Sequence, residues 1–296
     1  MQSSMISFSN AERAAALVSA LPGIQKCAGR TVVVKYGGHA MVDPELKQSV
    51  MEDIVLLNRL GVKVVLVHGG GPEINDMMQR LGKKPEFING LRVTDQETAA
   101  IVQMVLAGKV NKSLAGLIGA KGGRAVGLSG LDDRLIEAKC KKPELGFVGE
   151  VTKINTRIID DLLERGYIPV IATIGCGEKG EVYNINGDTA AACLAGSLQA
   201  EYLLMLTDIA GILRDPADAS TLIPELTVKE AEKLAQEGII SGGMLPKVEY
   251  CVRAVREGVK KVIIMDGRVP HAVLMELFTD ERAGTMFLEG ENGDEY

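Results

Sequence analysis

The chain has 296 residues, of which 46% are hydrophobic and 24% are charged, and its formal net charge is −6. This length can bury the core of one large domain or of two lobes, and the acidic charge argues against nucleic acid as the main partner. We find no apolar run near the roughly 18 residues that span a bilayer and no secretory signal, so we expect a cytoplasmic protein without a membrane partner. The five cysteines are scattered without a C-x-x-C pair, which favours free thiols over a disulfide framework or a metal site.

An amphipathic helix is predicted near the N-terminus, because Ser9 and Glu12 have the spacing of a capping box. Apolar residues then recur at helical spacing, namely Ala14, Leu17, Val18 and Leu21. This helix precedes the first strand, so nothing in the sequence requires it to join the central sheet.

From residue 31 onward, predicted strands and helices alternate. Strands are expected at 31–36, 62–67, 125–128, 168–174, 202–207 and 261–265, with an antiparallel excursion at 134–153. Helices are expected at 44–60, 156–165 and 188–198, and two more are expected to begin at Pro72 and Pro246. Two further helices are expected to begin at caps: one at Thr94 and Glu97, which runs through 107 and past Gly108, and one at Thr227 and Glu230. This alternation predicts an α/β fold, a three-layer αβα sandwich with a mainly parallel central sheet.

Two strand ends open into glycine loops. Lys35 is the second-last residue of the apolar strand predicted at 31–36, and Gly37 and Gly38 follow that strand at once. A charge there is costly unless an anion compensates for it, and the glycines let backbone N–H groups approach the same anion. The strand at 62–67 ends similarly, in 68–71 before a helix start that favours anions. These two strand ends predict a phosphate-handling enzyme, since ordinary tight turns would explain the glycines but not the lysine. Neither loop has the sequence of a P-loop or of a dinucleotide-binding fingerprint.

Further along the chain, Lys247 lies in the first turn of a predicted helix, where the helix dipole disfavours a cation by about 0.3–1 kcal/mol. A phosphate that contacts both Lys247 and the preceding Gly242 and Gly243 would account for it; a solvated surface lysine is the alternative. The segment 184–192 brings Asn186 and Asp188 to the start of an alanine-rich helix. Either residue could simply cap that helix, and Asp188 could also pair with both lysines.

Two more loops carry candidate ligand contacts. Thr207 and Asp208 begin a turn that resembles a nucleotide-contacting turn, although Asp208 could serve only to cap it. Arg92 precedes a predicted helix and is suited to hold a carboxylate through two hydrogen bonds. A surface salt bridge is an equal alternative for Arg92.

Taken in order, these motifs closely resemble the amino acid kinase family, and in particular its members that phosphorylate N-acetyl-L-glutamate. The resemblance covers about residues 9–288. It rests on Lys35-Tyr36-Gly37-Gly38, His68-Gly69-Gly70-Gly71, Asn89-Gly90-Leu91-Arg92-Val93-Thr94, residues 184–188, Thr207-Asp208 and Gly243-Met244-x-x-Lys247. It implies transfer of a phosphoryl group from MgATP to the γ-carboxylate of N-acetyl-L-glutamate, the second step of arginine biosynthesis.

The resemblance also implies roles for individual residues. Lys35 and Lys247 would stabilise the transferring phosphoryl group, and Asp188 would orient them. Acetylglutamate would be held by Gly70, Gly71, Asn184 and Arg92, the last on its α-carboxylate. ATP would be contacted by Gly37, Gly38, Thr207, Asp208, Gly211 and Met244. Mg²⁺ would be held mainly through the ATP phosphates, without a protein metal site. No general base is needed, because a carboxylate nucleophile is already ionised at pH 7.

The implied organisation is a helix at 1–28 for oligomerisation or regulation, an acyl-substrate lobe at 29–180 and a nucleotide lobe at 181–296, on one continuous sheet. Relatives with such a helix and a segment like 271–284 tend to be hexamers inhibited by arginine, so we expect a homo-oligomer, dimer or hexamer, with arginine feedback. Candidate arginine contacts are Glu276, Glu281 and Gly284, although both glutamates could equally be surface charges. The apolar stripe of the helix fits interlocking between dimers or packing on its own domain.

Other substrates and another class of protein compete with this interpretation. Carbamate kinase, glutamate 5-kinase, aspartokinase and uridylate kinase share the implied fold and lysines, but the segment 90–94 favours acetylglutamate. A non-catalytic nucleotide or oxyanion-binding protein is the alternative from a different class. The presence of Lys35, Lys247 and Asp188 together argues against it.

Overall fold

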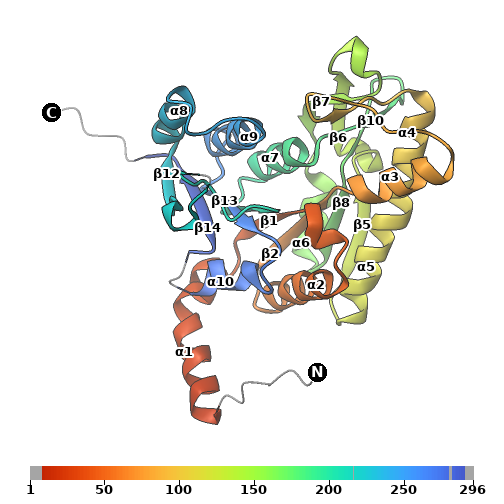
Figure 1. Cartoon of the computed structure of the whole chain (residues 1–296). Helices are drawn as coiled ribbons and strands as arrows, with labels where there is room; N and C mark the ends of the chain where they lie inside the picture. The colour runs from red at the N-terminus through yellow and green to blue at the C-terminus, as the bar shows by residue number, and fades with distance from the viewer. Residues whose placement is uncertain (1–8, 216, 280–281, 291–296) are drawn as a thin grey trace, which may run out of the picture.

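An eight-stranded sheet forms the centre of the molecule, and helices cover both of its faces (Figure 1). The computed structural model describes residues 9–215, 217–279 and 282–290. The strands of this sheet are β1 (Thr31–Tyr36), β2 (Lys63–His68), β5 (Ala125–Ser129), β8 (Ile168–Ala172), β11 (Tyr202–Thr207), β12 (Glu225–Thr227), β13 (Lys261–Asp266) and β14 (Gly284–Leu288).

The strand order is β12-β14-β13-β11-β1-β2-β8-β5. The six strands from β13 to β5 pair in parallel, whereas β14 runs antiparallel to β13 and carries β12 parallel to itself. The sheet is therefore continuous and mainly parallel, with an antiparallel edge. Together with the helices on both faces, this confirms the predicted three-layer sandwich.

The alternation of side chains along each strand divides the core into two layers. Val32 and Val34 of β1 point into one layer, and Val33 points into the other. The first layer contains residues of α2 (Pro44–Arg59), α3 (Gly71–Arg80), α5 (Asn111–Ala120) and α10 (Ala272–Phe278). The second contains residues of α6 (Arg157–Glu164), α7 (Gly187–Ser197), α8 (Val228–Gln236) and α9 (Met244–Arg256).

Two small sheets lie outside the central one. A two-stranded ribbon joins β3 (Phe87–Ile88) to β4 (Leu91–Arg92). A four-stranded sheet has the order β10-β9-β6-β7, from β6 (Ile136–Cys140), β7 (Gly149–Ile154), β9 (Ile174–Cys176) and β10 (Val182–Asn184). The antiparallel excursion predicted at 134–153 is the pair β6 and β7. The strand predicted at 168–174 ends earlier, at Ala172, because the chain then leaves the central sheet for β9.

A long helical run connects the ribbon to β5. It consists of α4 (Gln96–Gln103), a π-helical segment (Met104–Val110) and α5. By length and composition, the whole run Gln96–Ala120 is a helix that could cross a membrane, which the sequence analysis did not anticipate. One face of it is buried in the core, as expected of a core helix, whereas Met104 is exposed. The buried apolar residues are Ile101, Val102, Val105, Leu106, Val110, Leu114 and Ile118.

Three predicted helix starts need correction. Asp95, not Thr94, caps α4, because the Asp95 carboxylate accepts the Thr98 N–H at 2.8 Å. The Thr94 hydroxyl is buried and donates to the Arg92 carbonyl. Helix α9 begins at Met244, two residues before Pro246, and α3 begins one residue before Pro72. Both prolines lie in a first turn, where the N–H that proline lacks has no partner within the helix.

Helix α1 (Asn10–Cys27) extends away from the sheet (Figure 1). It begins with the predicted capping box between Ser9 and Glu12, which is confirmed. Near its C-terminal end it lies against α10, where a Cβ at Gly23 would come within 2.5 Å of the Leu277 carbonyl oxygen. The apolar stripe of α1 does not pack on its own domain, since the side chains of Leu17 and Leu21 are 73% and 49% exposed.

Candidate active site

The carboxyl ends of neighbouring parallel strands bring the predicted motifs to one edge of the central sheet. Lys35 on β1 is in register with Val67 on β2 and with Met205 on β11. The loops that follow β1, β2 and β11 therefore begin side by side. This is the edge at which open α/β sheets bind their ligands.

One buried carboxylate joins the two predicted lysines. Asp188 Oδ1 lies 2.8 Å from Lys35 Nζ, and Asp188 Oδ2 lies 2.9 Å from Lys247 Nζ. The side chain of Asp188 is 10% exposed, that of Lys35 12% and that of Lys247 29%. Two glycines make room for Lys35: a Cβ at Gly37 would lie 2.9 Å from its Nζ, and a Cβ at Gly187 would lie 3.4 Å from its Cε. Sheet and helix residues distant in sequence thus form one compact charged cluster.

The start of α7 sets the position of Asp188. Asn186 caps the helix, because its side-chain oxygen accepts the Thr189 N–H at 3.0 Å. Asp188 is the second residue of the helix, and since Asn186 serves as the cap, the Asp188 carboxylate is available to pair with the lysines. Burial alone would raise the pKa of the Asp188 carboxyl, but the charges of Lys35 and Lys247 outweigh it and lower this pKa to about 2. The carboxylate is therefore fully ionised at neutral pH.

A cavity of about 170 Å³ opens in front of the glycine loop that follows β2. Gly70 and Gly71 lie on one side of it, with Arg92 and Asn184 also in its lining. These four residues are the ones that the resemblance assigned to acetylglutamate. The amide of Asn184 donates to the Thr94 hydroxyl at 3.3 Å, which ties β10 to the segment after Arg92.

Arg92 is a buried guanidinium without a carboxylate partner among the described residues. Its Nη2 donates to Asn75 Oδ1 at 2.7 Å, and its guanidinium lies over the Phe87 ring, 4.8 Å from the centroid. Burial lowers the pKa of this guanidinium. The surface salt bridge considered for Arg92 is therefore wrong, and its positive charge faces the cavity uncompensated.

A second cavity, of about 450 Å³, lies beyond the end of β11. Asp208, Gly211 and Met244, three of the residues that the resemblance assigned to ATP, line it. Gly38 allows the loop after β1 to lie close to the loop after β11, since a Cβ at Gly38 would lie 2.7 Å from Asp208 Oδ1. The Thr207 hydroxyl instead accepts the Ile209 N–H at 3.2 Å, so this side chain shapes the turn itself.

A third cavity, of about 540 Å³, lies between the other two and is lined by Asp188 and Lys247. It shares Gly90, Leu91 and Asn186 with the glycine-loop cavity. On its other side, Gly243 is adjacent in sequence to Met244 of the cavity at β11. The charged cluster therefore stands between two cavities that can hold two different small molecules.

Two of the predicted regulatory residues belong to other elements than the lysine cluster: Glu276 lies on α10, and Gly284 begins β14. Glu276 on α10 is buried, and its carboxylate accepts the Ala283 N–H at 2.7 Å and faces Arg282 Nη1 at 3.3 Å. A surface charge at Glu276 is therefore excluded. Gly284 begins β14, where a Cβ would lie 2.0 Å from the Ile264 carbonyl oxygen. Glu281 lies outside the described residues.

Neither a metal centre nor a disulfide is formed by the described residues. No group of three or more histidine, cysteine, aspartate or glutamate side chains within 9–215, 217–279 and 282–290 is arranged to hold a metal ion. All five cysteines are free, and four of them are buried.

Sequence reasoning missed several residues that shape the glycine-loop cavity. Asn75 and Phe87 hold the Arg92 guanidinium, and Asn111 contacts the buried ring of His68. One signal was available for Asn111, because it is an asparagine inside an otherwise apolar helical run. Asn75 and Phe87 gave no such signal, since each is an ordinary residue in a polar segment.

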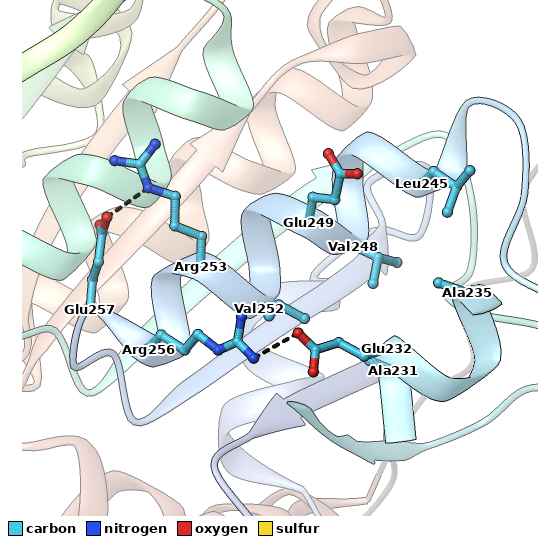
Figure 2. Close-up of a pocket in the computed structure, with 10 residues that line it drawn as sticks. All are labelled: Ala231, Glu232, Ala235, Leu245, Val248, Glu249, Val252, Arg253, Arg256 and Glu257. Carbon is cyan, nitrogen blue, oxygen red and sulfur yellow. Dashed lines mark hydrogen bonds and ion pairs between the residues drawn. The ribbon is translucent and has the colours of Figure 1, made fainter. Parts of the chain in front are cut away.

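A further cavity, of about 450 Å³, lies on the outer side of the molecule between α8 and α9 (Figure 2). Four of its charged lining residues are paired with one another, Arg256 with Glu232 and Arg253 with Glu257, each at 2.6 Å. Its lining from α9 includes Leu245 and other residues on the side of that helix away from Lys247. This cavity is therefore separate from the active site.

Residues 30–266 match the model of the amino acid kinase family. The chain belongs to this family, as its sheet and lysine cluster indicate. The acetylglutamate kinase of Clostridioides difficile is 54% identical over 278 residues, which cover 94% of this chain and 97% of that protein. The acetylglutamate kinase of Heliobacterium modesticaldum is 53% identical over 290 residues, covering 94% and 98%. Within its family the chain therefore belongs to the acetylglutamate kinases, which use ATP to phosphorylate N-acetyl-L-glutamate in arginine biosynthesis.

Solved structures of other proteins share the fold of this chain. The N-acetylglutamate synthase of Neisseria gonorrhoeae, complexed with coenzyme A and N-acetyl-glutamate, superposes with a TM-score of 0.82 at 28% identity, over 94% of this chain and 63% of that one. Its complex with coenzyme A and L-arginine gives a TM-score of 0.76 at 27% identity, over 94% and 65%. The Giardia carbamate kinase, at 19% identity over 89% of this chain and all of that one with a TM-score of 0.66, shares the fold. The identity to acetylglutamate kinases decides among the alternative phosphoryl acceptors.

Proposed function

We propose that the lysine cluster performs in-line phosphoryl transfer from ATP to the γ-carboxylate of N-acetyl-L-glutamate. The observation that carries the proposal is a single buried carboxylate, Asp188, which holds two ammonium groups at 2.8 and 2.9 Å between two cavities. Phosphoryl transfer depends mainly on positioning and on neutralising charge. Lys35 and Lys247 supply that positive charge, and Asp188 keeps both ammonium groups directed at one point.

The glycine-loop cavity would hold the acyl substrate. The uncompensated guanidinium of Arg92 is matched to the α-carboxylate of acetylglutamate, because a buried cation without a partner is costly until an anion binds. Gly70 and Gly71 would present backbone N–H groups to the reacting carboxylate, and Asn184 would complete the pocket. The γ-carboxylate is ionised at neutral pH and attacks without a general base.

The cavity at the end of β11 would hold the nucleotide. Asp208, Gly211 and Met244 would contact the nucleoside, with Thr207 shaping their turn, while Gly37 and Gly38 would bring backbone N–H groups to the phosphates. Mg²⁺ would be carried by the ATP phosphates and would add positive charge there. Residues of 29–180 would thus make most contacts to the acyl substrate, joined by Asn184, and residues of 181–296 would make most contacts to the nucleotide, joined by Gly37 and Gly38.

We also propose that the enzyme is a cytoplasmic homo-oligomer, a hexamer in its regulated form, inhibited by arginine. The exposed stripe of α1 supports this, because exposed leucines on a projecting helix mark an association surface. The Glu276 carboxylate, which already faces the guanidinium of Arg282, is chemically suited to a free arginine, with Gly284 at its side. Glu281 would be a further contact.

The test is release of ADP from MgATP with N-acetyl-L-glutamate, compared with free glutamate, aspartate and UMP, each with and without arginine. We expect turnover with acetylglutamate only, and inhibition by arginine that is lost when residues 1–25 are removed. Lys35→Ala and Lys247→Ala should each lower kcat by about two or more orders of magnitude, with folding retained. Near-normal turnover in both variants would refute the catalytic roles, and inhibition that survives the truncation would refute the regulatory role of α1.

A further inference from the structure

The glycine loop after β2 contains a peptide group whose orientation is not restricted by neighbouring side chains. The peptide that joins Gly69 to Gly70 is flanked by glycine on both sides, so no Cβ restricts its rotation. A trans peptide is planar, with its C=O and N–H pointing in opposite directions. Whatever fixes the Gly69 carbonyl therefore also fixes the direction of the Gly70 N–H.

A buried imidazole fixes that carbonyl. His68 is fully buried, and its Nδ1 lies 2.8 Å from the Gly69 carbonyl oxygen. A carbonyl oxygen only accepts, so Nδ1 must carry the proton. The Gly70 N–H then points away from the ring, and Gly69, Gly70 and Gly71 all line the acyl-substrate cavity. Within the described part of the chain, no acceptor is found for the Gly70 N–H.

Asn111 in turn fixes the imidazole. Its Nδ2 lies 3.0 Å from His68 Nε2, and also 2.8 Å from the Val170 carbonyl oxygen and 3.1 Å from that of Leu128. Two carbonyls accept from this atom, so it is the amide nitrogen. Its two hydrogens are shared among three acceptors, and His68 Nε2, which faces this donor, is the unprotonated nitrogen of the ring. Asn111 is itself fully buried, and Gly127 makes room for it, since a Cβ there would lie 2.0 Å from Asn111 Oδ1.

The π-helical segment before α5 positions the residues that contact His68 and the glycine loop. The Asn111 N–H donates to the Leu106 carbonyl, five residues earlier, so that residues five apart become neighbours along the helix. Leu106 lies against Gly70, where a Cβ would come within 2.6 Å of its Cδ2. One irregular turn thus supports the glycine loop with both Leu106 and Asn111.

We propose that His68 and Asn111 are positioning residues for the phosphoryl transfer, acting through the peptide between Gly69 and Gly70. His68 keeps the Gly70 N–H directed into the acyl-substrate cavity, and Asn111 holds His68 in the neutral Nδ1–H tautomer that can do so. The inference rests on the proposed role of Gly70 in holding acetylglutamate. Burial lowers the pKa of His68 to about 4, so the ring stays neutral at physiological pH.

Two nearly isosteric variants test the proposal. His68→Asn keeps a donor at the δ position, whereas His68→Leu removes it. We expect kcat to fall by about 100-fold in His68→Leu and by less than about 10-fold in His68→Asn, with the KM for ATP unchanged in both. Equal losses in the two variants, or a kcat for His68→Leu within about threefold of the wild type, would overturn it.

Asn111→Leu should lower kcat by about 10- to 100-fold. Its matched control is Leu114→Ala, one turn further along α5 and fully buried, which should lower thermal stability but not kcat. Similar kcat values in these two variants would overturn the role of Asn111.

The ¹⁵N spectrum of the imidazoles gives a readout that does not depend on activity or on the folding of a variant. The chain has only three histidines, and the His68 ring should be the Nδ1–H tautomer in the wild type. An Nε2–H tautomer at His68 would overturn the proposal. Failure of the wild type itself to phosphorylate acetylglutamate would instead refute the proposed function.

Discussion

Replacing Asp188 by asparagine should separate the two lysines without changing the shape of the site. The amide has nearly the size of the carboxylate but no charge, so the ammonium groups of Lys35 and Lys247 lose the ion pairs at 2.8 and 2.9 Å and repel each other. The pKa of Asp188 lies at about 2 instead of 3.8. This difference corresponds to roughly 2 kcal/mol of net stabilisation at neutral pH.

Catalysis should suffer more than stability. Displacing both phosphoryl-stabilising cations should lower kcat by about 10²- to 10³-fold, as the loss of positioned charge does elsewhere. The assay is ADP release at saturating ATP and acetylglutamate, with Asp53→Asn as the control, because Asp53 is also a buried aspartate but lies on α2. A kcat for Asp188→Asn within about fivefold of the wild type would refute the idea that this carboxylate positions the lysines.

The stability of this variant should depend on pH in a defined direction. A carboxyl with a lowered pKa in the folded state stabilises the fold above its unfolded pKa and loses that contribution as the pH falls through the folded value. The wild type should therefore exceed Asp188→Asn in unfolding free energy at pH 7, and the difference should shrink between about pH 4 and pH 2. A difference independent of pH would show that the carboxylate charge is not responsible.

Three further predictions concern other parts of the molecule. Arg92→Lys should raise the KM for acetylglutamate by about 10- to 100-fold without changing the KM for ATP, since lysine cannot make the bidentate contact; an unchanged acetylglutamate KM would contradict this. Burial raises the pKa of Asp53 to about 6 despite its bond to His271. As the pH rises from about 4 to about 6, the unfolding free energy of the wild type should therefore fall relative to that of Asp53→Asn, which lacks this carboxyl. Parallel pH profiles of the two proteins would count against that explanation. Leu17→Ser combined with Leu21→Ser should shift the protein to a smaller oligomer in sedimentation experiments while keeping its turnover, and an unchanged sedimentation coefficient would rule out this surface as the contact.

The parts of the fold predicted well from the sequence are those in which a local pattern and its tertiary role agree. Strands such as 31–36 and 202–207 are continuous apolar runs because both faces of a central parallel strand are buried. The antiparallel edge was not predicted. Strand β12 has only three residues, and β14 has no alternation, so their pairing depends on contacts between residues about 60 apart in sequence.

The charged cluster could be anticipated, but the support around it could not. Lys35 and Lys247 each stand where a cation is locally unfavourable, and such a conflict is visible in a single sequence. The cap at Asp95 was misjudged as Thr94 because both residue types favour that position, and only the tertiary bond from Thr94 to the Arg92 carbonyl distinguishes them. The π-helical register before Asn111 likewise has no signature in local residue preferences.

The two lysines that share Asp188 are anchored with unequal stiffness. Lys35 belongs to β1, which is hydrogen-bonded to a parallel strand on each side. Lys247 belongs to α9, whose N-terminus has no side-chain cap and follows Gly242 in a left-handed conformation. Any change of shape that accompanies nucleotide entry should therefore be absorbed at the start of α9. Lys35 would then serve as the fixed reference of the site, and Lys247 as the group that adjusts to the distance between the two substrates.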